Sequence, residues 1–129
     1  MKHIKSLFAP SRFAAIALAA LIIAPATLAT AVAQDFWQQA AQNYTIWENY
    51  MKRGVAYFNQ GDTDAAIAEF TKAISVLPRH PDSYAARGHA YRKKGDLKKA
   101  LADFDKALEI NPQHAEANAG RKLAMDSKR

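Results

Sequence analysis

The sequence predicts an all-α fold built from stacked helix–turn–helix units. The stretch GDTDAAIAEF (61–70) recurs 34 residues later as GDLKKALADF (95–104). Between the turns, apolar residues recur at helical spacing. A fixed period of this size is typical of stacked structural units, and about two and a half units are predicted. When residues 47–80 are laid over 81–114 without a gap, identical pairs occur at Tyr50/Tyr84, Arg53/Arg87, Gly54/Gly88, Tyr57/Tyr91, Gly61/Gly95, Asp62/Asp96, Ala66/Ala100, Phe70/Phe104, Lys72/Lys106, Ala73/Ala107, Pro78/Pro112 and His80/His114.

The first 33 residues predict a signal peptide. They contain no acidic residue, begin with basic residues, continue with an apolar run and end in Ala31-Val32-Ala33. This order is typical of a secretory signal, so we expect cleavage after Ala33 and a mature chain that is periplasmic or secreted. The alternative is an uncleaved anchor, because Phe13 to Ala33 gives 21 uncharged residues, close to the ~20 that span a bilayer. Pro25 and the small residues before Gln34 favour cleavage.

Residues 34–46 form a predicted N-terminal helical extension that is rich in aromatic residues. Phe36, Ala40, Tyr44 and Trp47 fall on one helical stripe. Two interpretations stay open at this stage. The stretch extends or caps the first helix of the array, or it offers a contact surface to a second chain or to a membrane.

Each predicted unit, 47–80 and 81–114, holds two helices with a Gly-Asp turn between them. In the second unit we expect the helices over 83–94 and 97–110. Gly95 closes the first helix because glycine adopts the left-handed conformation without a steric penalty. Asp96 caps the next helix by accepting from its free N–H groups, which is worth about 1 kcal/mol. Gly88 lies inside a helix, where glycine costs about 1 kcal/mol against alanine, so we expect a neighbour to approach it closely. The prolines after the second helices prevent their continuation.

These residues resemble the tetratricopeptide repeat, a 34-residue helix–turn–helix unit that stacks into a right-handed solenoid. The resemblance covers residues 47–114. Two positions depart from the common pattern, because tyrosine stands where tryptophan is frequent and Arg53 and Arg87 stand where leucine is frequent. The resemblance implies the fold and a general role in binding partners, but it names no partner. The matching residues are Tyr50, Gly54, Tyr57, Ala66, Phe70, Ala73 and Pro78 in the first unit, and Tyr84, Gly88, Tyr91, Ala100, Phe104, Ala107 and Pro112 in the second.

Residues 115–129 predict a C-terminal capping helix. The stretch keeps the phase of a first helix but no second helix follows it. Terminal units of repeat arrays turn a polar face outward. Six charged residues fit that role: Glu116, Arg121, Lys122, Asp126, Lys128 and Arg129.

Composition argues against several functional classes. The net charge is +6, and without Lys2, Lys5 and Arg12 the remaining 15 basic and 12 acidic residues leave about +3, too little to indicate nucleic-acid binding. The chain has no cysteine, so it must hold by packing alone. The histidines lie one repeat apart rather than in a metal-binding cluster. No serine stands beside a base and a third orienting group, as nucleophilic catalysis requires. We therefore expect a non-enzymatic protein without a metal or cofactor.

The predicted binding surface is the concave side, which the resemblance places on the first helix of each unit. The predicted partner is a peptide or protein with an apolar residue and, a few residues away, an acidic one. A family variant that grips a C-terminal carboxylate with Lys, Asn and Arg is not predicted, since Met51, Val55, Ala85 and Ala86 stand near those positions. The capping helix adds Glu116, or alternatively folds over the face and covers it. The predicted contact residues are Met51, Val55, Phe58 and Asn59, with His89, Arg92 and Lys93 as a basic half.

A second function class remains open, a structural or assembly scaffold. In that case the array stacks on itself, or the uncleaved signal keeps it anchored to the membrane. The basic cluster Arg92–Lys99 is interpreted either as a solvated corner or as a docking patch for an acidic partner or anionic lipid.

Overall fold

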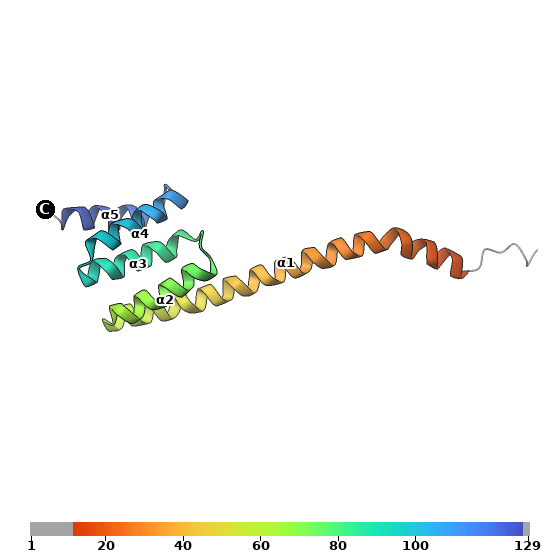
Figure 1. Ribbon diagram of the computed structural model, residues 1–129, viewed down its shortest axis with the longest axis horizontal. Helices are drawn as coiled ribbons and strands as arrows, with labels where there is room; N and C mark the ends of the chain where they lie inside the picture. The colour runs from red at the N-terminus through yellow and green to blue at the C-terminus, as the bar shows by residue number, and fades with distance from the viewer. Residues whose placement is uncertain (1–11, 128–129) are drawn as a thin grey trace, which may run out of the picture. The chain divides into compact units, whose positions relative to one another are not determined.

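The computed structural model describes the backbone of residues 12–127 and the side chains of residues 27–127. This part of the chain holds five helices and no strand, which confirms the all-α prediction (Figure 1). The helices are α1 (Arg12–Gln60), α2 (Thr63–Val76), α3 (Pro81–Lys94), α4 (Leu97–Ile110) and α5 (Ala115–Asp126). The chain divides into two units, residues 1–40 and 41–129, and each is described by itself.

The first unit is described from residue 12 onward and consists of the early part of α1. Its side chains from 27 to 40 are all exposed, including Leu28, Val32 and Phe36 on one helical stripe. The basic start of the predicted signal, residues 1–11, lies outside the described residues, as do the side chains of its apolar run up to residue 26. No helical stretch within the described part of the chain is both long enough and apolar enough to cross a bilayer.

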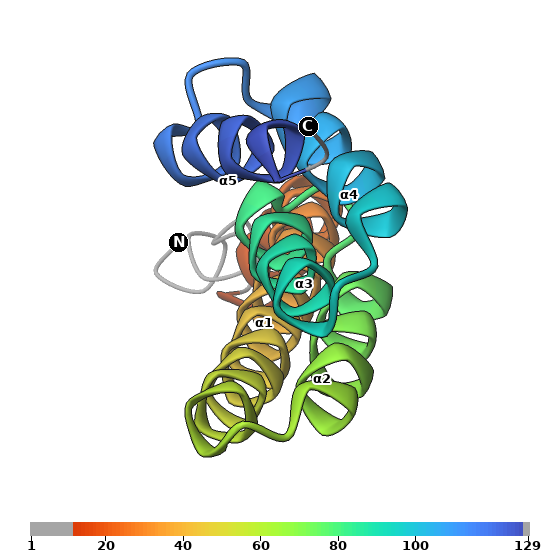
Figure 2. The same ribbon diagram turned by 90° about the vertical axis from the view of Figure 1, so that its left-hand side faces the viewer.

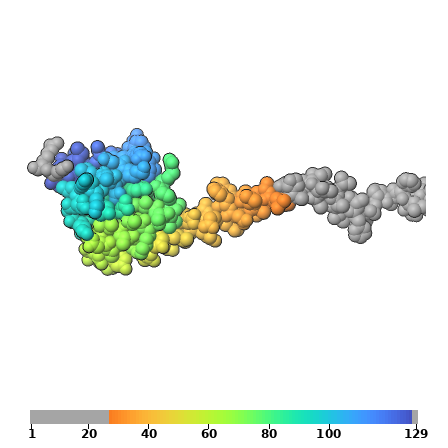
Figure 3. Space-filling view, viewed as in Figure 1, coloured from red at the N-terminus to blue at the C-terminus, as the bar shows by residue number. Residues whose placement is uncertain are grey.

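The second unit is a stack of helices that follow one another in space as in sequence. Neighbours pack from α2 through α5, and α3 also contacts α5. Seen end-on to the helices, α2 and α4 lie on the right of the stack and the end of α1 and α5 lie on the left, with α3 between them (Figure 2). Figure 3 shows one face on which the side chains of successive helices close against one another. This arrangement is a helical repeat array, as predicted.

The Gly-Asp turns have the conformation that the sequence predicts. Gly61 and Gly95 have φ values of +87° and +89°, which favour glycine because it lacks a Cβ. The side chain of Asp62 accepts from the backbone N–H of Ala65 at 3.0 Å, and that of Asp96 accepts from Lys99 at 3.2 Å. The same device therefore ends one helix and caps the next in both units.

The two recurring phenylalanines form the centre of the core. Phe70 is 2% exposed and Phe104 is 0% exposed. A Cβ added to Gly88 would lie 2.8 Å from the Phe104 ring, and one added to Gly54 would overlap Phe70 in the same way. The close approach predicted at these glycines is therefore made by the aromatic ring of the following helix. Gly120 on α5 also approaches this ring, with only 2.5 Å between an added Cβ and Phe104.

The two arginines that depart from the common repeat pattern form equivalent ion pairs. Arg53 pairs with Glu69 at 2.6 Å, and Arg87 pairs with Asp103 through two contacts of 2.8 Å. Both acidic residues are buried. Hydrogen bonds from Lys72 and then from Arg53 hold the pKa of Glu69 below its usual value against the opposing effect of burial. Each pair joins the first helix of its unit to the second.

Trp47 ties α1 to the following repeat. It is 6% exposed, its ring lies 4.0 Å from that of His80, and its indole N–H donates to the buried Ser83 hydroxyl at 2.6 Å. By contrast, Tyr44 is about half exposed and Trp37 is 69% exposed. The aromatic residues predicted to lie on one stripe therefore differ in burial. Trp47 is a core residue, and the aromatic side chains of the first unit are exposed.

Candidate functional site

A groove of about 340 Å³ lies at the predicted binding surface. It contains four of the predicted contact residues, Val55 and Phe58 from α1 and His89 and Arg92 from α3. Three further residues complete the lining: Phe70 of α2, Ala86 of α3 and Glu116 of α5. Val55 remains 47% exposed, so α5 borders this face without covering it.

The other three predicted contact residues lie elsewhere. Met51 is half-buried and packs against the core cluster that contains Phe70. Asn59 is exposed near the end of α1 and does not line the groove. The Lys93 side chain contacts Phe58. Its ammonium donates to the Phe58 carbonyl at 3.0 Å and lies 4.5 Å from the centre of the Phe58 ring.

The predicted basic half of the surface needs correction. Burial lowers the pKa of His89 below its usual value, and the charge of Arg92 lowers it further. The charge and backbone of Glu116 oppose this shift but do not reverse it. His89 is therefore neutral at pH 7 and packs its ring edge-on against Phe104 at 5.0 Å. With Lys93 held by Phe58, Arg92 is the cationic side chain that lines the groove.

Two charged side chains, those of Arg92 and Glu116, line the groove. The Nε atom of Arg92 is buried and makes no hydrogen bond within residues 27–127, and a buried donor without a partner is costly. The Glu116 side chain is exposed in the first turn of α5. It forms no hydrogen bond or ion pair with any side chain that the structure describes. The groove therefore combines an apolar floor with one donor and one carboxylate.

The histidines at the two corners between units have structural roles that the sequence did not reveal. His114 is buried and caps α5, since its Nδ1 accepts from the Ala117 N–H at 3.1 Å. Its Nε2 contacts an oxygen of Asp82 at 2.7 Å. These two contacts fit the neutral ring with its proton on Nε2. His80 makes no such cap and stacks on Trp47 instead.

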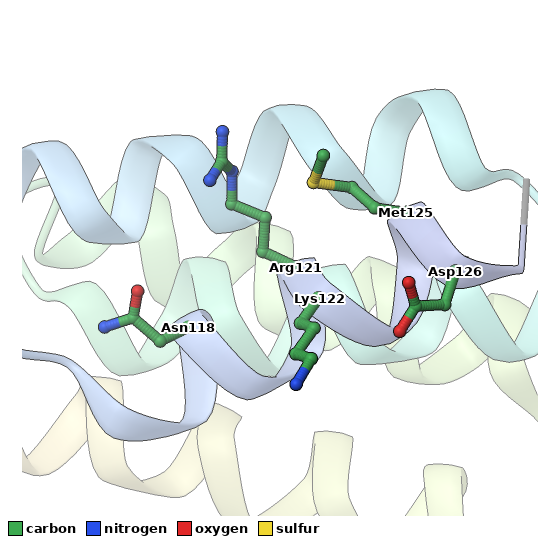
Figure 4. A pocket seen from close by; sticks show the side chains of 5 residues that line it. All are labelled: Asn118, Arg121, Lys122, Met125 and Asp126. Carbon is green, nitrogen blue, oxygen red and sulfur yellow. The ribbon is translucent and has the colours of Figure 1, made fainter.

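A second hollow of about 330 Å³ lies on α5, at the end of the array. Figure 4 shows Arg121 and Met125 on the same side of this helix, with Lys122 on another. Arg121 pairs with Asp105 of α4 at 2.6 Å. Lys122 occupies the place that corresponds to Gly54 and Gly88, so no aromatic ring could pack there as it does in the two complete units. The hollow is lined by Asn118, Arg121, Lys122, Met125 and Asp126.

The serine hydroxyls that could act as nucleophiles form structural hydrogen bonds. Ser83 is buried and accepts from Trp47, and the hydroxyls of Ser75 and Ser127 donate to backbone carbonyls of their own helices. In the described part of the chain, no three histidine, aspartate or glutamate side chains come together as a metal site would need. Within the cluster Arg92–Lys99, Lys94 pairs with Asp64 and Lys99 with Asp96. The feature of the described residues that could accommodate a ligand is therefore the groove lined by Val55, Phe58, His89 and Arg92.

The fold is that of a helical repeat protein with an open groove lined by residues of α1, α2, α3 and α5. Two family models agree: one described as tetratricopeptide repeat matches residues 81–114, and one described as TPR repeat matches residues 54–95. Residues 54–114 thus match the tetratricopeptide pattern, and the array is similar to tetratricopeptide repeats. The chain matches no curated protein sequence.

Solved tetratricopeptide domains have the same fold. The TPR domain of Arabidopsis OM64 is 24% identical with a TM-score of 0.64, covering 66% of this chain and 70% of that chain. The TPR2B domain of yeast Sti1, solved as a pHsp70 complex, is 26% identical with a TM-score of 0.63, covering 64% and 66%. The first TPR domain of Spaghetti (RPAP3), bound to the HSP90 peptide SRMEEVD, is 26% identical with a TM-score of 0.63, covering 64% and 68%. The chain thus spans about two thirds of each of these domains.

Proposed function

We propose that the chain is a non-catalytic interaction module that binds a segment of a peptide or protein partner in the groove. The observation that carries the proposal is the convergence of Val55, Phe58, His89 and Arg92 on one open groove. An apolar ligand side chain fits between Val55, Phe58 and Ala86, where its burial supplies affinity. The guanidinium of Arg92, a residue that lines the groove, then donates to an acceptor of the ligand.

The solved neighbours support this kind of ligand. The Sti1 and RPAP3 domains are described with bound pHsp70 and HSP90 peptide, respectively. A shared fold does not carry over a partner, so the identity of the bound segment is not transferred to this chain.

We place this activity in the cell envelope. The proposal rests on the signal-like first 33 residues and predicts a mature chain that begins at Gln34. The chain would then be periplasmic or secreted and would meet the membrane only during export. An anchored form with an uncleaved signal is the alternative.

A double substitution tests the groove. In Val55→Glu with Arg92→Glu, a carboxylate replaces the apolar wall and a second replaces the donor, so partner capture from an envelope extract should be lost while the melting temperature stays nearly unchanged. The control is Ala56→Glu with Arg79→Glu, which makes the same charge change at residues outside the groove. The intact mass of the recovered bait reports in the same experiment whether the chain begins at Gln34.

Two outcomes would contradict this proposal. If the double variant folds and still captures its partner, the binding surface lies elsewhere. If it unfolds, Val55 and Arg92 belong to the core. A full-length bait recovered from the membrane fraction would support the anchored form.

A self-associating scaffold is the second candidate function. In the uncleaved chain it is favoured by the exposed stripe of Leu28, Val32 and Phe36 in the first unit, because apolar side chains at helical spacing are typical of helix–helix contacts. Light scattering distinguishes the two functions, since only self-association makes the mass of the purified chain depend on its own concentration.

A further inference from the structure

Glu116 gives the groove a charge preference. The residue lies on α5 and borders a groove whose remaining walls come from α1, α2 and α3. Its side chain is exposed, and no basic side chain among residues 27–127 neutralises it by an ion pair. A ligand that enters the groove therefore meets a free carboxylate.

Arg92 does not cancel this preference. Arg92 is half-buried and forms no ion pair with Glu116, whereas the Glu116 side chain is exposed. A backbone carbonyl, which an extended peptide presents at every residue, is a sufficient acceptor for the Arg92 guanidinium. Arg92 can thus be satisfied by any peptide, and the side-chain charge of the ligand is selected at Glu116.

The peptide bound to the RPAP3 domain, SRMEEVD, ends in three acidic residues out of four. In the present groove such a peptide would bring its carboxylates to Glu116. Of the residues that line the groove, Arg92 alone carries a positive charge that could counter them. Like charges brought together in a partly desolvated groove repel.

We propose, on the basis of the proposed function, that the groove selects a peptide segment that carries a basic side chain beside its apolar anchor. Glu116 accepts from that basic side chain, Arg92 donates to the ligand backbone, and the anchor packs between Val55, Phe58 and Ala86. The groove discriminates against acidic C-terminal tails. Its ligand is an internal segment of a partner protein or a tail without a free carboxylate.

Two synthetic probes test this with the full chain. One is SRMEEVD with a free C-terminus. The other is SRMKKVK with an amidated C-terminus, which keeps the methionine and valine anchors and replaces each acidic residue by lysine. In fluorescence anisotropy at low salt we expect the lysine peptide to bind about tenfold more tightly. The ratio should fall as salt is added, since exposed charges are screened over about 10 Å at 0.1 M.

Charge variants assign the preference to Glu116. Glu116→Lys should reverse the ratio, and Glu116→Gln, which keeps the side-chain shape, should bring it close to one. Glu109→Lys is the matched control, because Glu109 is an exposed glutamate of α4 outside the groove and its replacement changes the net charge equally. It should leave the ratio as in the unmodified chain.

The outcomes separate this inference from the proposed function. If both peptides bind in the groove with equal affinity, or the acidic peptide binds more tightly, the charge preference is wrong and the groove still binds peptides. The same holds if Glu116→Gln leaves the ratio unchanged. If neither peptide binds at concentrations of about 1 mM, the proposed function is wrong and this inference with it.

Discussion

Phe104→Ala should unfold most of the domain at 37 °C. The ring is 0% exposed and is enclosed by Gly88 of α3, Gly120 of α5 and the ring of His89. Removing a buried phenylalanine costs about 3–5 kcal/mol, against a total stability of about 5–15 kcal/mol for an ordinary domain. Because the two glycines have no side chain that could fill the space, we expect the upper part of that range. Circular dichroism during urea and thermal unfolding measures the loss.

Phe36→Ala is the matched control, since Phe36 is 66% exposed and exposed substitutions usually change stability by less than about 0.5 kcal/mol. If Phe104→Ala remained folded at 37 °C with a transition like that of Phe36→Ala, the placement of α4 between α3 and α5 would be wrong.

Trp47→Ala should be nearly as damaging. This substitution removes a 6% exposed indole, its stacking on His80 and the hydrogen bond to Ser83, and thereby loosens α1 from the repeat that follows. The expected loss is about 3–5 kcal/mol. Trp47→Phe keeps most of the ring but leaves the buried Ser83 hydroxyl without its donor, at a cost of about 1–3 kcal/mol.

Trp37→Ala is the control for Trp47→Ala, because Trp37 is the same residue type in the first unit and is 69% exposed. Its unfolding curve should match that of the unmodified chain. Equal destabilisation by Trp37→Ala and Trp47→Ala would show that the assignment of Trp47 to the core and of Trp37 to the exposed surface is incorrect.

The array could be predicted from sequence because local and periodic signals agree. Gly95 and Asp96 determine where one helix ends and the next begins through bonds that span three or four residues. The period then assigns the same roles to Gly61 and Asp62. The helix predicted over residues 97–110 has the bounds of α4. Each of these features depends on neighbours in sequence, which a single chain displays directly.

The arginine ion pairs were missed, although a signal was present. Arg53 and Glu69 are 16 residues apart, as are Arg87 and Asp103. Glu69 and Asp103 are themselves related by the 34-residue period. The two units have an acidic residue at this position, but one is glutamate and the other is aspartate. An alignment that considers only identical residues therefore does not reveal the pair.

The chemistry of the groove was predicted only in part, because it depends on distances across the fold. The sequence identified Val55, Phe58, His89 and Arg92 by their place on the first helices, and the fold brings them together. It could not show that burial keeps His89 neutral or that Lys93 reaches back 35 residues to the Phe58 carbonyl. The hydrogen bond between Trp47 and Ser83, which are 36 residues apart, could not be predicted for the same reason.

The central claim, that the groove is the binding surface, is tested most directly by mapping a bound peptide on the full chain. Backbone amide signals are followed by NMR while the amidated SRMKKVK peptide is added. We expect the shifts to concentrate at Val55, Phe58, Ala86 and Glu116, and the signals of Asn118 and Lys122 in the hollow on α5 to stay unchanged. Shifts confined to that hollow, or to the exposed stripe of Leu28, Val32 and Phe36, would contradict this claim.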